Sequence, residues 1–160
     1  MRILGVDPGL NTTGYGLIQG KGLKVNLIEA GFIRTALKKG VPERLNHIHR
    51  ALSQLILNSK PEVLVLEKLY SHWRHPTTAY ALGQARGIIC LAARQNNIPV
   101  IEYPATRIKK AVSGNGHCSK MQMQKMIQNL LSLKEIPKPA DIADALSLAI
   151  GHSYIMMSKI

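Results

Sequence analysis

The segment Val63–Leu66 is apolar at four successive positions, a pattern typical of a β-strand buried on both faces. Such a strand requires helices on either side of its sheet, because each face has to be covered. An amphipathic helical pattern precedes this strand, from Val41 to about Leu55, and a second helical pattern follows the strand, Pro76–Gln95. This alternation predicts parallel strands joined by helical crossovers.

Three strand-like segments precede this region. They are Arg2–Val6, Thr13–Ile18 and Leu23–Ile33, and the sequence Gln-Gly-Lys-Gly between the last two predicts a hairpin turn. We therefore expect an antiparallel meander. Beyond Gln95 the patterns predict a strand and then three helices: Pro99–Tyr103, Ile108–Val112, Met121–Leu131 and a helix opened by Pro139 that runs to about Met157.

The predicted fold class is α/β, with a five-stranded mixed sheet (three antiparallel strands, then two parallel ones) and helices on both faces. No linker or repeat divides the sequence, so we expect a single domain over residues 1–160. No apolar run approaches the roughly 18 residues of a membrane-spanning helix. Cys90 and Cys118 form no paired motif, and they are expected to be free thiols in the cytoplasm.

The charge balance restricts the partners of the chain. Lys and Arg number 21 against 9 Asp and Glu, which gives a net charge of +12. So large an excess indicates a polyanion partner, and nucleic acid is favoured over a membrane surface because no basic helix carries a bulky apolar face.

Four carboxylates fall where an α/β sheet places ligands. Asp7 ends the first predicted strand and Glu67 ends the buried strand, while Asp141 and Asp144 lie three residues apart in the first turn of the last helix. Each position also has an ordinary explanation, namely a turn, an exposed strand end or favourable charges at a helix N-terminus. If the four converge, two carboxylates about 4 Å apart repel by roughly 4 kcal/mol at an effective dielectric of 20, so a cation is required. An all-oxygen ligand set favours Mg²⁺, with Mn²⁺ as a substitute, and two such ions can act together on a scissile phosphate.

Sequence blocks around these carboxylates resemble the RuvC family of Holliday junction resolvases. The blocks are Asp7-Pro8-Gly9 with Thr13-Gly14-Tyr15-Gly16, Glu67-Lys68-Leu69-Tyr70 with Leu82-Gly83-Gln84-Ala85-Arg86-Gly87, Lys109 with Gly114-Asn115-Gly116, Lys120 and Gln124, and Asp141-Ile142-Ala143-Asp144-Ala145-Leu146. They cover nearly the whole chain in order.

The resemblance implies an RNase H-like fold and a homodimer that nicks two opposed strands of a four-way DNA junction symmetrically. It implies that Asp7, Glu67, Asp141 and Asp144 are catalytic metal ligands, and that RuvA and RuvB are partners. The loop after Tyr70, Ser71-His72-Trp73-Arg74-His75, departs from the family pattern.

DNA contacts are predicted for Tyr70, Arg74, Arg86, Lys109 and Lys120. Tyr70 could stack on a base at an opened junction or pack on its own helix. A lysine near the phosphate could offset transition-state charge, or simply be solvated. His72 and His75 form a poor zinc motif without Cys or His partners.

The small residues Gly83, Ala85 and Gly87 leave two interpretations open, close packing within the fold or a dimer contact. Three other functions compete with the nuclease. A DNA-binding protein without catalysis would bind better without negative charge at its DNA face, so the four carboxylates argue against this function. A kinase-like or actin-like ATPase needs a second half that this length does not hold. Another RNase H-like nuclease, acting on RNA for example, shares the fold.

Overall fold

The computed structural model describes residues 1–69 and 76–158. Its sheet has the strand order β3-β2-β1-β4-β5. The strands are β1 (Arg2–Asp7), β2 (Thr12–Lys21), β3 (Lys24–Arg34), β4 (Val63–Glu67) and β5 (Val100–Tyr103). β1, β2 and β3 pair antiparallel, whereas β4 runs parallel to β1 and β5 runs parallel to β4. The predicted mixed sheet is confirmed.

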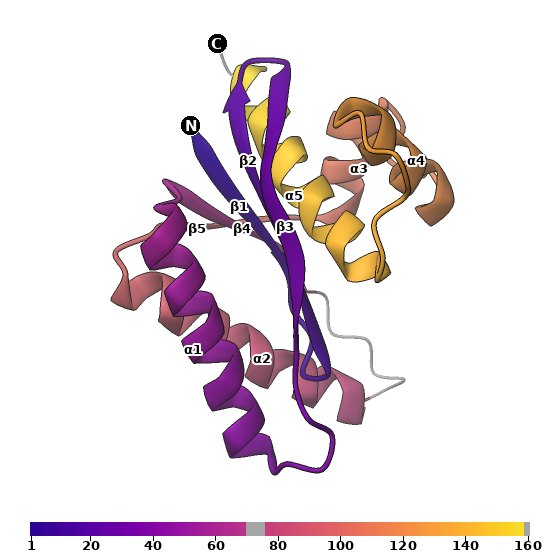
Figure 1. Ribbon diagram of the computed structural model, residues 1–160. Helices are drawn as coiled ribbons and strands as arrows, with labels where there is room; N and C mark the ends of the chain where they lie inside the picture. The colour runs from indigo at the N-terminus through magenta and orange to yellow at the C-terminus, as the bar shows by residue number, and fades with distance from the viewer. Residues whose placement is uncertain (70–75, 159–160) are drawn as a thin grey trace.

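Helices cover both faces of the sheet (Figure 1). They are α1 (Val41–Ser59), α2 (Pro76–Gln95), α3 (Ala105–Ser113), α4 (Lys120–Leu130) and α5 (Ala140–Met157). α1 and α2 lie together on one face, and α5 crosses the other with α3 and α4 outside it. None of the helices in the described ranges is long and apolar enough to span a bilayer.

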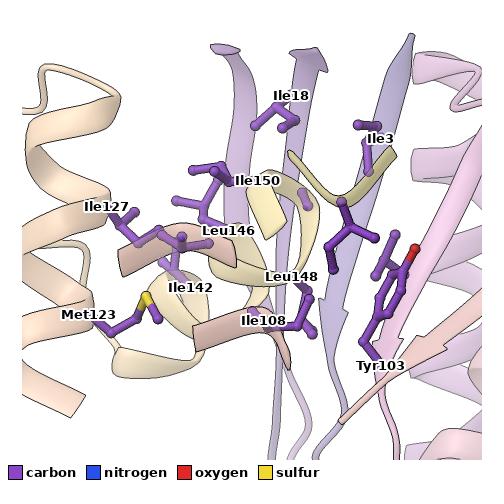
Figure 2. Packing of buried hydrophobic residues seen from close by; sticks show 14 of the residues in the cluster. Ile3, Ile18, Tyr103, Ile108, Met123, Ile127, Ile142, Leu146, Leu148 and Ile150 are labelled. Atoms are coloured by element: carbon purple, nitrogen blue, oxygen red, sulfur yellow. The ribbon is translucent and has the colours of Figure 1, made fainter. Parts of the chain in front are cut away.

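The all-apolar strand β4 is buried on both faces, as predicted. Val63 and Val65 belong to the core under α5, whereas Leu64 and Leu66 belong to the core under α1 and α2. Figure 2 shows the first core, where residues of α3, α4 and α5 meet those of the sheet.

Glycines allow α5 to lie unusually close to β1 and β2. A Cβ on Gly5 would stand 2.0 Å from the carbonyl oxygen of Ala145, and a Cβ on Gly14 would stand 2.2 Å from that of Asp141. These distances are far below van der Waals contact, so no side chain fits between the helix backbone and the strands. The glycines therefore fix the depth at which the first turn of α5 meets the sheet.

Two element boundaries and one packing interpretation differ from the predictions. The hairpin turns at Gly22 and Leu23 rather than over four residues, because strand pairing continues to Lys21 and Lys24 and only Gly22 has to adopt a positive φ, of 66°. α3 begins at Ala105, earlier than predicted, directly after Pro104.

Among the described residues, nothing lies within 4 Å of a Cβ built at Gly83 or at Gly87, so close packing within the fold does not explain these two glycines. Ala85, by contrast, is buried in the core.

Replacing Gly5 by alanine should test the close contact of α5 with the sheet. Because the new Cβ would meet backbone atoms, Gly5→Ala is expected to lower the free energy of unfolding by about 3 kcal/mol or more. Gly20→Ala is the matched control in β2, since its Cβ would meet side-chain atoms of Ser153 and Ile3 and no helix backbone, and it should cost about 1 kcal/mol. Urea unfolding measures both, and equal losses would contradict the account.

Candidate active site

Two of the predicted carboxylates lie at the same edge of the sheet. Asp7 is the last residue of β1 and Glu67 the last residue of β4. Since these strands are parallel neighbours, their carboxyl ends meet at one edge, where ligand sites form in such sheets. The topology thus brings together residues sixty positions apart in sequence.

The first turns of α5 add the other two carboxylates. Asp144 lines a pocket of about 260 Å³ together with Asp7 and Glu67, and the lysines Lys109 and Lys120 complete its charged lining. Asp141 lines the adjoining hollow, so three of the four predicted carboxylates share one pocket and the fourth lies just beside it.

The close carboxylates change the proton affinity of Asp7. Burial, followed by the charges of Asp144, Asp141 and Glu67, raises the pKa of Asp7 from 3.8 to about 7, against the opposing charge of Lys120. The pKa of Glu67 is also raised, first by burial and then by Asp144. A pocket that raises the pKa of Asp7 and Glu67 in this way is one that favours a bound cation.

A lysine supplies one positive charge inside this pocket. The ammonium of Lys120 donates a hydrogen bond of 2.7 Å to Asp144 Oδ2, and this bond raises the pKa of Lys120. Lys109 also lines the pocket, and its charge opposes the raised pKa of Glu67. Both lysines predicted from the sequence therefore face the carboxylates.

The chemistry of the pocket suits Mg²⁺ or Mn²⁺, since its acidic donors are all oxygen. In the conformation shown, no group of three or more Asp, Glu, His or Cys side chains from the described ranges is arranged to hold a metal ion. The carboxylates surround the pocket without closing on one point, and Asp144 is turned to Lys120. The donor types and charge fit a divalent cation, and side-chain rotation would have to complete the ligand set.

Arg86 holds the end of β4 in place. Its Nη1 donates a hydrogen bond of 2.7 Å to the carbonyl oxygen of Glu67. Its Nη2 lies 2.5 Å from Glu102 Oε1, an ion pair without hydrogen-bond geometry, and the side chain is only 13% exposed. These contacts position Glu67, while the DNA contact predicted for Arg86 stays a prediction.

Hydrogen bonds from Thr13, Thr35 and Arg44 fix the loop between β1 and β2, and the sequence did not single out Thr35 or Arg44. The Thr13 hydroxyl donates to the Gly9 carbonyl oxygen at 2.8 Å, and the Thr35 hydroxyl donates to that of Leu10 at 2.7 Å. Arg44 in turn donates from Nε to Thr35 Oγ1 at 2.9 Å and from Nη2 to Asn11 Oδ1. The available signal was the position of Arg44, four residues before the buried Ile48 and so on the inner side of an amphipathic helix.

The aromatic and basic residues predicted after β4 lie outside the described ranges. They are Tyr70, His72, Trp73, Arg74 and His75. The roles suggested for them stay predictions.

Comparison with known proteins gives one consistent family. The family model described as crossover junction endodeoxyribonuclease RuvC matches residues 3–152. The chain is 43% identical to the RuvC of Rhodopirellula baltica over 99% of its own length and 89% of that protein. It is 45% identical to the RuvC of Pseudothermotoga lettingae over 97% of its own length and 95% of that protein. Its fold matches the structure of T. thermophilus RuvC in complex with Holliday junction substrate with a TM-score of 0.93, at 31% identity over 99% of this chain and 96% of that one.

The raised pKa of Asp7 predicts how stability depends on pH. In the metal-free folded chain the carboxyl binds its proton below about pH 7, but in the unfolded chain only below about 3.8. Because the folded state then holds the extra proton between these values, this group makes the free energy of unfolding fall as pH rises through the interval. Above about pH 7 the Asp7 carboxyl is ionised in both states, and its destabilising contribution to the free energy of unfolding no longer changes with pH.

Asp7→Asn should remove this loss. We expect the variant to melt at a higher temperature than the wild type at pH 8 without metal, and at about the same temperature near pH 4. Calorimetry in a chelating buffer measures the difference. A variant less stable at pH 8 would show that Asp7 has a structural role instead.

Proposed function

Because the chain belongs to the RuvC family of crossover junction endodeoxyribonucleases, we propose that it hydrolyses phosphodiester bonds of four-way DNA junctions with the help of Mg²⁺. The observation that carries the proposal is the pocket that gathers Asp7, Glu67 and Asp144 with two lysines. A chain with a net charge of +12 attracts a phosphate backbone, and a cation allows a phosphate to approach these carboxylates. Recombination and DNA repair are the processes that such cutting serves.

Four residues would hold the metal, namely Asp7, Glu67, Asp141 and Asp144. Two divalent cations bound by them would supply an activated water and stabilise the leaving oxygen, and Mn²⁺ would substitute for Mg²⁺. The protein contributes the placement of these oxygens, since Asp7 and Glu67 are fixed by parallel strands and Arg86 holds the backbone at Glu67.

Lys120 has a separate role in this proposal. Its ammonium reaches the pocket from the start of α4 and contacts Asp144. The ammonium would also be placed to contact a phosphate oxygen bound in the pocket, where it would stabilise charge that develops in the transition state. Lys109 lies beside the same pocket and would contact the DNA backbone.

A homodimer would supply two such pockets, one for each of two opposed strands, and so permit symmetric paired nicks. Support comes from an exposed apolar stripe along α2, where Tyr80 is 70% exposed and Leu91 is 47% exposed. Gly83 and Gly87 lie between them in the helical spacing, both exposed and without neighbours. Sedimentation as a monomer at micromolar concentration would contradict the dimer.

The family also indicates RuvA and RuvB as partners and the cytoplasm as the site of action. Both belong to this proposal.

The direct test compares substrates. A labelled mobile four-way junction should receive paired symmetric nicks only with Mg²⁺ or Mn²⁺ present, while linear duplex and an RNA·DNA hybrid of the same sequence stay intact. Asp7→Asn, Glu67→Gln and Asp144→Asn should each abolish cutting but not junction binding. Tight junction binding without cutting, over several core sequences and both metals, would favour a binding protein without catalysis.

Lys120→Ala should separate catalysis from binding. We expect the single-turnover cleavage rate at saturating protein to fall by about 10²-fold, whereas junction affinity changes by less than about threefold. Lys125→Ala is the control, because Lys125 is an exposed lysine of the same helix that lies outside the pocket lining. If Lys120→Ala weakens affinity without slowing the saturated rate, Lys120 is a binding residue only.

A further inference from the structure

A broad basic hollow lies outside the acidic pocket. The end of β3, the loop after it and one side of α1 enclose a space of about 700 Å³. Four of its lining residues are cationic, Arg34, Lys39, Arg44 and Arg50, against the single acid Glu43. So uneven a lining gives this hollow a positive potential.

A second hollow shares a lining residue with this basic hollow and carries one of the four carboxylates. It holds about 620 Å³ and is lined by residues 8–12 of the β1–β2 loop, by Thr77 and Thr78 of α2, and by Asp141. Arg44 lines both this hollow and the basic one. At its other end, Asp141 lies one helical turn from Asp144 in the acidic pocket. Arg44 therefore connects the lining of the two hollows, and Asp141 places the second hollow close to the acidic pocket.

The cations of the basic hollow are free to meet an external anion. Among the residues that the structure describes, none of the four forms an ion pair with a carboxylate, in contrast to Lys120 and Arg86. Arg44 is oriented by neutral groups, Thr35 and Asn11, which leave its charge uncompensated and some of its five N–H donors available. An oriented guanidinium is well suited to bind a phosphate group.

We propose that this hollow binds the sugar–phosphate backbone of one duplex arm of the junction, on the strand that continues from the scissile phosphate. This inference rests on the proposed function and adds a second binding surface to it. The carboxylates of the acidic pocket repel phosphates in the absence of metal, so cations placed beyond the pocket would add to the affinity that Lys109 and Lys120 supply. The contacts are to phosphates alone, so they position the arm and carry no sequence preference.

Charge reversal at two exposed positions tests the surface. Lys39→Glu/Arg50→Glu alters residues whose side chains are exposed, so folding is maintained. The control, Lys21→Glu/Lys24→Glu, makes the same change of net charge at the β2–β3 hairpin. That hairpin lies at the opposite end of β3 from the hollow, 11 residues or roughly 35 Å away (Figure 1).

Binding of a labelled four-way junction is measured by fluorescence anisotropy in a chelating buffer at several salt concentrations, with melting curves to confirm that both variants are folded. For the hollow variant we expect affinity to fall at least about tenfold and the slope of log K against log salt to decrease by about 2 in magnitude, one unit per lost phosphate contact. The control should keep the wild-type slope, an affinity within about threefold and the wild-type cleavage rate.

Two results would overturn the inference while leaving the proposed function intact. One is a hollow variant that binds the junction with wild-type affinity and salt slope. The other is an equal loss in both variants, which would mean that net charge matters and the hollow does not. A wild-type protein that neither binds nor cuts junctions would instead refute the proposed function, and this inference with it.

Discussion

The backbone of α5 rests directly on β1 and β2, and the active-site geometry depends on this contact. Glycines at positions 5 and 14 leave no side chain between the helix and the strands. The contact is made by the first turns of α5, which carry Asp141 and Asp144, and β1 ends at Asp7 beside them. A larger residue in either strand would lift the helix and move two carboxylates away from the other two.

This contact has an electrostatic cost that the rest of the pocket partly offsets. Burial and three neighbouring carboxylates raise the pKa of Asp7 to about 7, so the metal-free pocket is under repulsion at neutral pH. Lys120 reduces the repulsion through Asp144, and Lys109 opposes it at Glu67. The cost is understandable if the pocket exists to bind cations, because the repulsion that destabilises the metal-free protein becomes attraction for Mg²⁺.

Much of the fold could be predicted because its signals are local. The all-apolar run of β4, the helical spacing of α1 and the turn residues of the hairpin each reflect a period set by backbone geometry. Convergence of the carboxylates could be anticipated from strand ends and helix starts. That Asp141 lines the adjoining hollow while Asp144 faces Lys120 could not, since it depends on the angle at which α5 crosses the sheet.

Other features required the tertiary structure. The sequence predicts a DNA contact for Arg86, and the structure adds a hydrogen bond to the Glu67 carbonyl oxygen, a pairing between distant segments that no local pattern encodes. Both interpretations of Gly83 and Gly87 stayed open from the sequence alone, although the family resemblance favoured a dimer contact, and among the described residues nothing lies within 4 Å of a Cβ built at either position. The basic hollow could not be predicted from the sequence either. Its cations come from β3, a loop and α1, and nothing in their sequence spacing brings them together.

If the carboxylates beside the start of α5 form a divalent metal site, calorimetry of the isolated protein at pH 8 will detect it without DNA. Mg²⁺ should raise the melting temperature of the wild type, by the equivalent of about 2.7 kcal/mol at one hundred times the dissociation constant. Asp7→Asn should start from a higher metal-free melting temperature and gain little. An equal rise in both proteins, or no rise in either with Mg²⁺ or Mn²⁺, would contradict the account.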